Sequence, residues 1–182
     1  MQRAASSTVD RMIRAARLDV DVYEELERDT SATWQALSVV IIVAIASGVG
    51  ALLAGIVRGV PGIAVGGFIG GIIAAVIGWA IWSLVTYLVG TTLFGGTASY
   101  GELLRTIGFA YTPNALQILG FIPLIGALIV ILAEIWALVA GVVAVRQALD
   151  FSTGKAILTV SIGWVTMLVI TALIMTLIGL GL

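Results

Sequence analysis

The sequence contains no cysteine and no histidine, and it has few charged residues for its length. The lack of cysteine excludes disulfides, thiolate catalysis and cysteine metal ligands, and the lack of histidine excludes imidazole catalysis and most zinc sites. A net charge of −1 provides no basic excess for phosphate binding, so we expect no nucleic-acid partner. Beyond the N-terminal segment the only carboxylates are Glu102, Glu134 and Asp150, which are too scattered in sequence to nominate an acid–base pair. We therefore expect no enzymatic activity, no metal and no cofactor.

Apolar residues are abundant in the chain. They make up 60% of its 182 positions, and charged residues make up 10%, whereas a soluble domain carries roughly 25% charged residues. Four stretches without charge, residues 30–57, 59–101, 106–133 and 156–182, each exceed the about 20 residues that an α-helix needs to cross a bilayer. The composition predicts an all-α, polytopic membrane helical bundle in contact with the lipid bilayer.

The chain divides into a charged N-terminal segment, residues 1–33, and a transmembrane domain, residues 34–182. Ser99 and Glu102 have the spacing of a capping box and predict a helix start between the second and third apolar segments. Pro113 and several polar residues interrupt that third segment, so we expect it to be kinked or re-entrant. The five predicted spans cover about residues 36–57, 63–89, 101–119, 123–145 and 156–177.

The distribution of basic residues favours five spans over four. With five spans and the N-terminus inside, the cytoplasmic side holds the five arginines of residues 1–33 together with Arg105, Arg146 and Lys155, against Arg58 alone outside. If residues 101–119 did not cross, the bias would fall to six against three. We therefore expect a multi-pass protein of the cell membrane with a cytoplasmic N-terminus and an external C-terminus.

Apolar residues recur at helical spacing in the N-terminal segment, from Val9 to about Tyr23. This pattern predicts an amphipathic helix that lies flat on the membrane surface, with Arg11, Arg14 and Arg17 favouring anionic lipid. Two alternatives are a solvated helix that docks against the cytoplasmic face of the bundle and a helix that binds a protein partner.

Small residues recur at helical spacing in the first two spans. Gly48 and Gly55 in the first and Gly67, Gly71 and Gly78 in the second predict close packing of two helices, because small side chains let helix backbones approach each other. We expect these glycines to pack the helical hairpin. The alternative is a homodimer through the spare face of the second span.

Glu134 is the only acidic residue well inside a predicted span, since Glu102 lies at the start of the third, and an unpaired charge there is costly. Antiparallel pairing of the third and fourth spans predicts that Glu134 meets Arg105 or the Tyr111 hydroxyl and so fixes the register of the pair. The predicted intramembrane polar cluster consists of Glu134, Arg105, Tyr111, Thr106 and Asn114. The alternative is that Glu134 is a protonatable carboxylate in an ion or proton pathway.

Short elements of the second half of the chain resemble the prokaryotic branch of the Yip-one (Ypt-interacting protein) domain family, over roughly residues 34–177. They are residues 100–105 (Tyr-Gly-Glu-Leu-Leu-Arg), 108–113 (Gly-Phe-Ala-Tyr-Thr-Pro), 122–126 (Ile-Pro-Leu-Ile-Gly), Trp136 and 152–156 (Ser-Thr-Gly-Lys-Ala). The resemblance implies a five-span bundle with a cytoplasmic N-terminus. Eukaryotic members act in vesicle traffic and membrane shaping with small GTPases, and they carry an Asp-Leu-x-Gly-Pro element that this sequence lacks. The resemblance supplies no reaction.

We therefore expect a non-enzymatic membrane protein that organises membrane or protein partners. Its predicted contact surfaces are the N-terminal segment and the loops around Tyr100, Ser152 and Lys155. The alternative is a small ion or solute transporter or channel built on the broken third helix and Glu134, because interrupted helices and buried carboxylates are typical of transport pathways.

Overall fold

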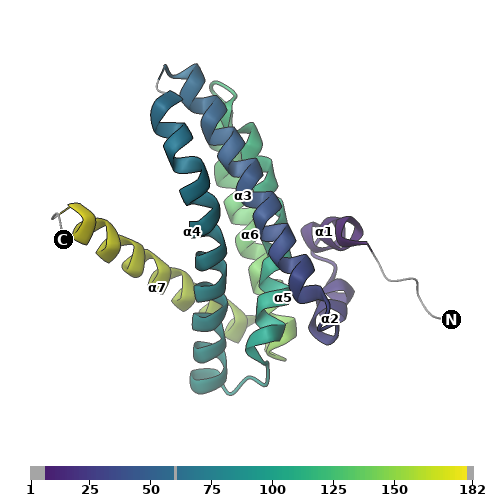
Figure 1. Cartoon of the computed structure of the whole chain (residues 1–182). Helices are drawn as coiled ribbons and strands as arrows, with labels where there is room; N and C mark the ends of the chain where they lie inside the picture. Colours follow the sequence, from purple (N-terminus) through teal and green to yellow (C-terminus); the bar gives the residue numbers. More distant parts are fainter. Residues whose placement is uncertain (1–6, 60, 180–182) are drawn as a thin grey trace.

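The computed structural model describes residues 7–59 and 61–179, leaving aside the side chains of residues 61–67, 171, 174, 175 and 177–179. The described part is helical throughout (Figure 1). Its elements are α1 (Thr8–Ala16), α2 (Val20–Arg28), α3 (Ala32–Val57), α4 (Pro61–Leu88), the π-helix η1 (Val89–Leu93), α5 (Tyr100–Ala110), the 3₁₀-helix η2 (Thr112–Phe121), α6 (Gly126–Ala148) and α7 (Thr153–Gly179).

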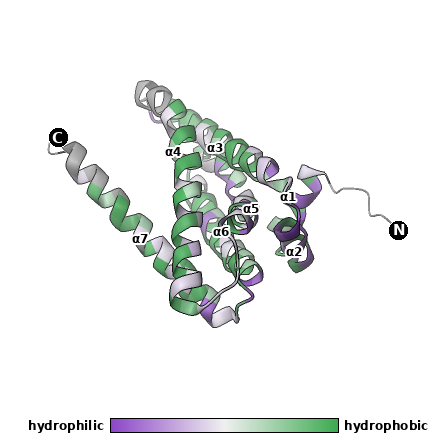
Figure 2. Ribbon diagram, turned by 60° about the horizontal axis from the view of Figure 1, so that its bottom comes forward, coloured by the Kyte–Doolittle hydropathy of each residue, from purple (hydrophilic) through white to green (hydrophobic). Residues whose placement is uncertain are grey.

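Four helices of the described residues, α3, α4 with η1, α6 and α7, are long and apolar enough to cross a membrane. They correspond to the first, second, fourth and fifth predicted spans. Figure 2 shows these helices as largely hydrophobic. The chain is thus a multi-pass, all-helical membrane protein.

The first and second spans form the predicted hairpin, with Gly59 in the turn at a positive φ of 76°. The fourth span begins later than predicted, at Gly126 instead of near Pro123. Pro123 lies in a tight turn in which the backbones of Gly120 and Gly126 approach so closely that a Cβ on Gly126 would lie 2.3 Å from the Gly120 carbonyl oxygen. The three residues that were expected to begin the helix therefore belong to the turn before it.

The break expected within residues 101–119 is confirmed. The capping box at Ser99 and Glu102 is present and starts α5, but α5 ends at Ala110 and is followed by η2. Pro113 lacks an amide donor and disfavours α-helical geometry at the residue before it, so the α-helix cannot continue unchanged through Thr112. The segment is a short α-helix followed by a 3₁₀-helix.

The two parts of this segment, α5 and η2, contact the same neighbouring helices. Both α5 and η2 contact α3 and α6, and α5 also contacts α4. Gly108 of α5 approaches Ala36 near the start of α3, and Gly50, much further along α3, approaches the backbone of Gln117 in η2. From Ala36 to Gly50 an α-helix rises about 21 Å, whereas nine residues of α-helix would rise only about 14 Å. The larger rise of a 3₁₀-helix, about 2.0 Å per residue, makes up part of this difference.

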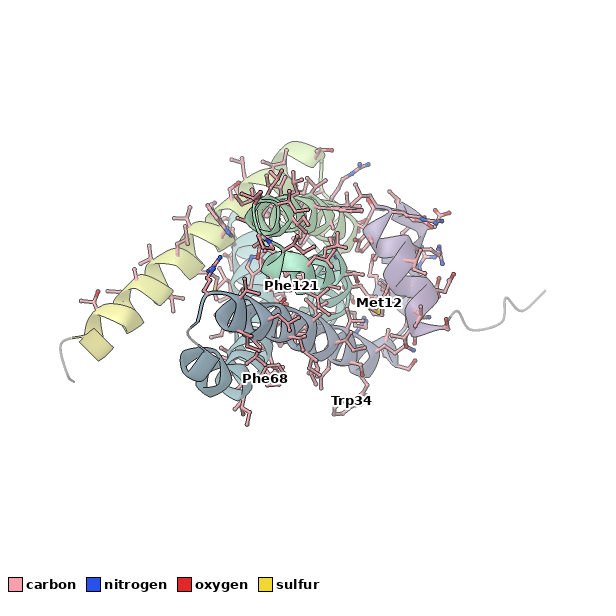
Figure 3. All side chains as sticks on the ribbon, turned by 90° about the horizontal axis from the view of Figure 1, so that it is seen from above. Met12, Trp34, Phe68 and Phe121 are labelled. Atoms are coloured by element: carbon pink, nitrogen blue, oxygen red, sulfur yellow. The ribbon has the colours of Figure 1, made fainter. Side chains whose placement is uncertain are left out.

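The N-terminal segment is not one continuous amphipathic helix. The chain turns between α1 and α2, where Leu18 adopts a positive φ of 61°. Both helices pack against the bundle beside α3, α5 and α6, in agreement with the docked alternative (Figure 1). In the view from above, Met12 points from α1 toward the bundle, whereas Trp34 at the start of α3 points outward (Figure 3).

The apolar core extends from the bundle into these N-terminal helices. Val22, Tyr23 and Leu26 of α2 are fully buried, as are Leu103 and Ile107 of α5, and all five belong to one cluster of buried side chains. The N-terminal helices are therefore an integral layer of the fold.

Candidate functional site

The N-terminal helices are held by a network of charges on their inner side. Arg11 is 3% exposed, and its guanidinium pairs with Glu25 and Asp29 at 2.8 Å each and donates to the Gln35 side chain of α3 at 3.0 Å. Arg14 pairs with Asp19 at 2.8 Å and with Glu25 at 3.0 Å. The prediction that Arg11 contacts lipid is wrong, because its guanidinium is buried and bound to carboxylates inside this layer. Arg14 is paired with carboxylates but partly exposed, so its predicted lipid contact stays a prediction.

Arg105 joins this layer to the bundle. It is 5% exposed, and its guanidinium donates to the backbone carbonyl oxygens of Leu26 and Glu27. These carbonyls belong to the last turn of α2, whose C-terminal carbonyls have no partners within the helix. A cation is favoured at this end of a helix dipole. Arg105 therefore attaches the end of α2 to α5.

The end of α1 is held in a similar way. The Tyr23 hydroxyl donates to the Ala15 carbonyl oxygen at 3.1 Å, and the Trp136 indole N–H of α6 donates to the Ala16 carbonyl oxygen at 2.7 Å. Burial raises the pKa of the Tyr23 hydroxyl, so it remains a donor over the whole neutral range. Both N-terminal helices are thus anchored through the carbonyl groups of their last turns.

Carboxylates gather around the contact of α2 with the bundle. Burial raises the pKa of Glu27 above its ordinary 4.5, and the negative charges of Glu102 and Asp150 raise it further. The pKa of Asp19 lies below 3.8 because Arg14 donates to it. The pKa of Asp29 is lowered by its hydrogen bond with Ser31 and by Arg11. The ionised form of Glu27 is therefore disfavoured in the folded protein, whereas the ionised forms of Asp19 and Asp29 are stabilised.

The outer side of the N-terminal helices is exposed and partly apolar. Val9 is 63% exposed and Ile13 47%, one helical turn apart on α1, and Val20 at the start of α2 is also exposed. Arg17 and Asp21 are exposed beside them. Of the three arginines predicted to contact lipid or a partner, Arg17 is the one that the structure leaves exposed.

The predicted loop contacts lie near the other end of the same layer. Tyr100 is partly buried and donates its hydroxyl to the Ala80 carbonyl oxygen of α4 at 3.0 Å, so it is a packing residue. Lys155 donates to the Phe94 carbonyl oxygen at 3.1 Å and lies over the Phe151 ring. Ser152 is exposed. Of these three, Ser152 and Lys155 have the exposed surface that a contact residue needs.

A cavity of about 680 Å³ lies between α4, the α5–η2 segment, α6 and α7. Its walls include small and apolar residues together with Trp82, Tyr111, Asn114, Glu134 and Trp164. The Trp82 and Tyr111 rings meet edge to face at 5.7 Å. The Asn114 side chain is 7% exposed and its Oδ1 has no hydrogen-bond partner, and the Trp82 indole N–H likewise has none. The volume is within the range of small-molecule sites.

Within the cavity the predicted pairing of Glu134 with Arg105 is wrong, and its predicted contact with the Tyr111 hydroxyl stays a prediction. The Glu134 carboxylate accepts from the Gln117 side-chain amide at 2.6 Å, whereas Arg105 is bound to α2. The register differs because η2 rises further per residue than the α-helix assumed in the prediction, which brings Gln117 to the level of Glu134. Tyr111 and Asn114 do line the cavity with Glu134. The Thr106 hydroxyl donates to the Glu102 carbonyl oxygen within its own helix.

The predicted packing glycines have different environments. A Cβ on Gly48 would lie 2.7 Å from the Phe68 ring of α4, and Gly55 is buried, so both belong to the first hairpin. Gly71 has open space around it, and Gly78 approaches nothing closer than Met167 at 4.0 Å. The surroundings of Gly67 fall outside the described residues. Gly71 and Gly78 therefore lie on a face of α4 that the hairpin does not use.

The family model of the Yip1 domain matches residues 20–174 of this chain. The chain belongs to the Yip1 domain family. Searches of curated proteins and of solved structures each returned no match. The match begins at the first residue of α2, so the family domain takes in the helix that Arg105 attaches to the bundle as well as the apolar helices. It confirms the family expected from the sequence.

The contacts of several residues that build these sites could not be predicted from the sequence of this Yip1 domain. Gln117 and Gln35 are isolated amides, and Trp136 and Trp82 are aromatic residues in apolar helices. Their partners come from elements distant in sequence, such as the Ala16 carbonyl for Trp136. Sequence position alone does not reveal such contacts, because they depend on how the helices pack.

Proposed function

We propose that this Yip1-family protein is a non-enzymatic membrane protein that organises protein or lipid partners at the face formed by α1 and α2. The observation that carries the proposal is the attachment of α2 to α5 through Arg105, which fixes the N-terminal helices in one position. A fixed pair of helices presents Val9, Ile13 and Arg17 as a preorganised surface, and preorganisation lowers the entropic cost of binding.

The proposed topology has five crossings, with the N-terminus in the cytoplasm, the C-terminus outside and the protein in the cell membrane. The contacts of both α5 and η2 with α3 and α6 support a crossing by the α5–η2 segment. The basic residues support the orientation, since only Arg58 would face outward. Residues 1–33 then form a cytoplasmic layer on the transmembrane domain, residues 34–182.

Within this topology the apolar side chains of Val9, Ile13 and Val20 are placed to enter the headgroup boundary, with the exposed indole of Trp34 beside the start of the first span. Tryptophan is favoured at that depth of the bilayer. Arg17, Asp21 and Ser152 are among the polar positions left for a protein partner. A homodimer through the open face of α4 around Gly70 and Gly71 remains a further prediction.

Photo-crosslinking from single cysteines tests the contact surface, because the chain has no cysteine of its own. A photoreactive maleimide is attached at Ile13, Arg17 or Asp21 in native membranes, with Arg58 in the α3–α4 turn as the control position. We expect adducts from the three N-terminal positions that differ from those of Arg58. The adducts should be lost when Arg105→Met is added, because the helices then leave their fixed position.

Two results would contradict the proposal. One is an absence of defined protein or lipid adducts at all three N-terminal positions. The other is a set of adducts that Arg105→Met leaves unchanged while it releases the helices.

The second candidate function is transport of a small ion or solute, and the cavity at Glu134 favours it. The broken α5–η2 segment forms one wall of this cavity, as broken helices do in many transporters. Flux into liposomes that contain the purified protein, compared with Glu134→Gln and with empty liposomes, tests this candidate. Flux equal to that of empty liposomes for all ions and solutes offered would remove it.

A further inference from the structure

The cavity between α4, the α5–η2 segment, α6 and α7 has a composition that is unusual inside a membrane. It contains one carboxylate, that of Glu134, and the basic residues are absent from its described lining. Arg105, the basic residue expected to pair with Glu134, is engaged with the carbonyl groups of α2 instead. Glu134 lies eight residues, or about 12 Å, from the start of α6, and its carboxylate accepts a hydrogen bond from the neutral amide of Gln117.

An ionised carboxylate at this depth is costly unless a positive charge approaches it. The aromatic residues around Glu134 add to the attraction for such a charge. Trp82, Tyr111 and Trp164 line the same cavity, and the faces of aromatic rings attract organic cations, tryptophan most strongly. The remaining walls are alanine, glycine and aliphatic residues, which suit an apolar ligand body.

The unpartnered Oδ1 of Asn114 is an independent sign that the cavity accommodates a ligand. This side chain is 7% exposed and lines the cavity, and a buried acceptor without a donor costs about 1–3 kcal/mol. A ligand with an N–H or a polarised C–H group would satisfy it. The cavity is partly open, and α7 leans away from the bundle beside it, so a ligand can enter sideways from the lipid (Figure 1).

We propose that this cavity binds a lipophilic organic monocation, a hydrophobic amine or a quaternary onium ion, with Glu134 as its counter-charge and the three aromatic rings around its charged centre. This site lies apart from the surface of α1 and α2 and goes beyond the organising function proposed for that surface. The cation binds in this cavity whether or not it is then transported.

Binding of radiolabelled tetraphenylphosphonium to the full-length protein tests the site. The protein is placed in nanodiscs of zwitterionic lipid, and binding to empty nanodiscs is subtracted. We expect saturable binding of one cation per chain, and no comparable binding of tetraphenylborate, an anion of similar size. Equal binding of the two ions would overturn the proposal, because the cavity would then select only for apolar bulk.

Matched variants test separately how the charge of Glu134 and the aromatic rings contribute to cation binding. Glu134→Gln should weaken binding at least about ten-fold, whereas Glu102→Gln, the same change in a capping box outside the cavity, should leave it unchanged. Trp164→Leu should weaken binding about three-fold or more, and Trp34→Leu, at an exposed position outside the cavity, should not. Unchanged binding in Glu134→Gln would overturn the proposal.

The ring variant keeps the test decisive if Glu134→Gln does not fold, because Trp164→Leu leaves the carboxylate in place. Full binding of the cation by Trp164→Leu would also overturn the assignment.

Discussion

The guanidinium of Arg105 donates to the carbonyl groups of Leu26 and Glu27, from a position that is almost completely buried. Hydrogen bonds from charged donors contribute about 1.5–3 kcal/mol each, and the carbonyls left behind after its removal would be unsatisfied. The Arg105 side chain thus strengthens the attachment of the end of α2, which the buried side chains of α2 also hold on the bundle.

Replacing Arg105 by methionine should lower the free energy of docking of α1 and α2 by about 3 kcal/mol. The docked state can be followed with a bimane dye on Arg17→Cys, because Trp136 hydrogen-bonds to the adjacent Ala16 and quenches a dye that lies beside it. We expect the dye to lose its quenching in Arg105→Met. Arg58→Met, at an exposed position in the α3–α4 turn, is the matched control. Equal quenching in both variants would contradict this role of Arg105.

The carboxylates of the N-terminal layer predict how docking depends on pH. The folded pKa values of Asp19 and Asp29 lie below the ordinary 3.8, so their contribution is complete above pH 3.8 and is lost as the pH falls through the folded values. Glu27 has the opposite sign, because its folded pKa lies above 4.5 and its ionisation weakens the folded state as the pH rises. Docking should therefore strengthen slightly from pH 7 toward 4.5 and weaken below 3.8.

The same bimane dye measures this profile. Glu27→Gln should remove the gain between pH 7 and 4.5, and Asp29→Asn should reduce the loss below pH 3.8. A profile that both variants leave unchanged would show that other groups control docking.

At the scale of elements, the α5–η2 segment depends on a very close approach to α3. A Cβ on Gly50 would lie 2.3 Å from the Gln117 carbonyl oxygen and 2.9 Å from the Ile118 Cα, and neither backbone atom can move without shifting η2. The 3₁₀ geometry of η2 and the small residue on α3 are therefore coupled.

Gly50→Ala should destabilise the protein by about 1–3 kcal/mol, as overpacking does in a well-packed core. The matched substitution is Gly70→Ala in α4, where a Cβ would have open space and should be neutral or slightly stabilising. Thermal unfolding in one detergent compares the two variants. Equal stability of both would mean that η2 is not packed against α3 as described.

Some of these elements could be predicted from the sequence, and others could not. The long apolar stretches predicted α3, α4, α6 and α7, and the spacing of Ser99 and Glu102 predicted the start of α5, because these signals lie within each element. Pro113 indicated a break, but the 3₁₀ geometry after it depends on contacts with α3 and α6. For the same reason the predicted pairing of Glu134 with Arg105 was wrong, since its register follows from the rise of η2.

At the scale of the whole molecule, the N-terminal helices and the start of α5 form one layer. The amphipathic pattern of residues 9–23 predicted helix but not its orientation: Arg11 faces inward because Glu25 and Asp29 neutralise it, while Val9 and Ile13 remain outside. A charge pattern alone could not distinguish this arrangement from a helix on the lipid surface, because the compensating carboxylates lie in the next helix.

The five-crossing topology places this layer, the loop before Tyr100 and the loop at Ser152 on one side of the membrane. Single cysteines at Ser99, Ser152, Arg58 and Leu124, all exposed, are labelled from each side with a membrane-impermeant maleimide. Five crossings predict that Ser99 and Ser152 react only from the cytoplasm and that Arg58 and Leu124 react only from outside. Labelling of Ser152 from outside would contradict the crossing of α5–η2 and, with it, the single cytoplasmic face on which the proposed function rests.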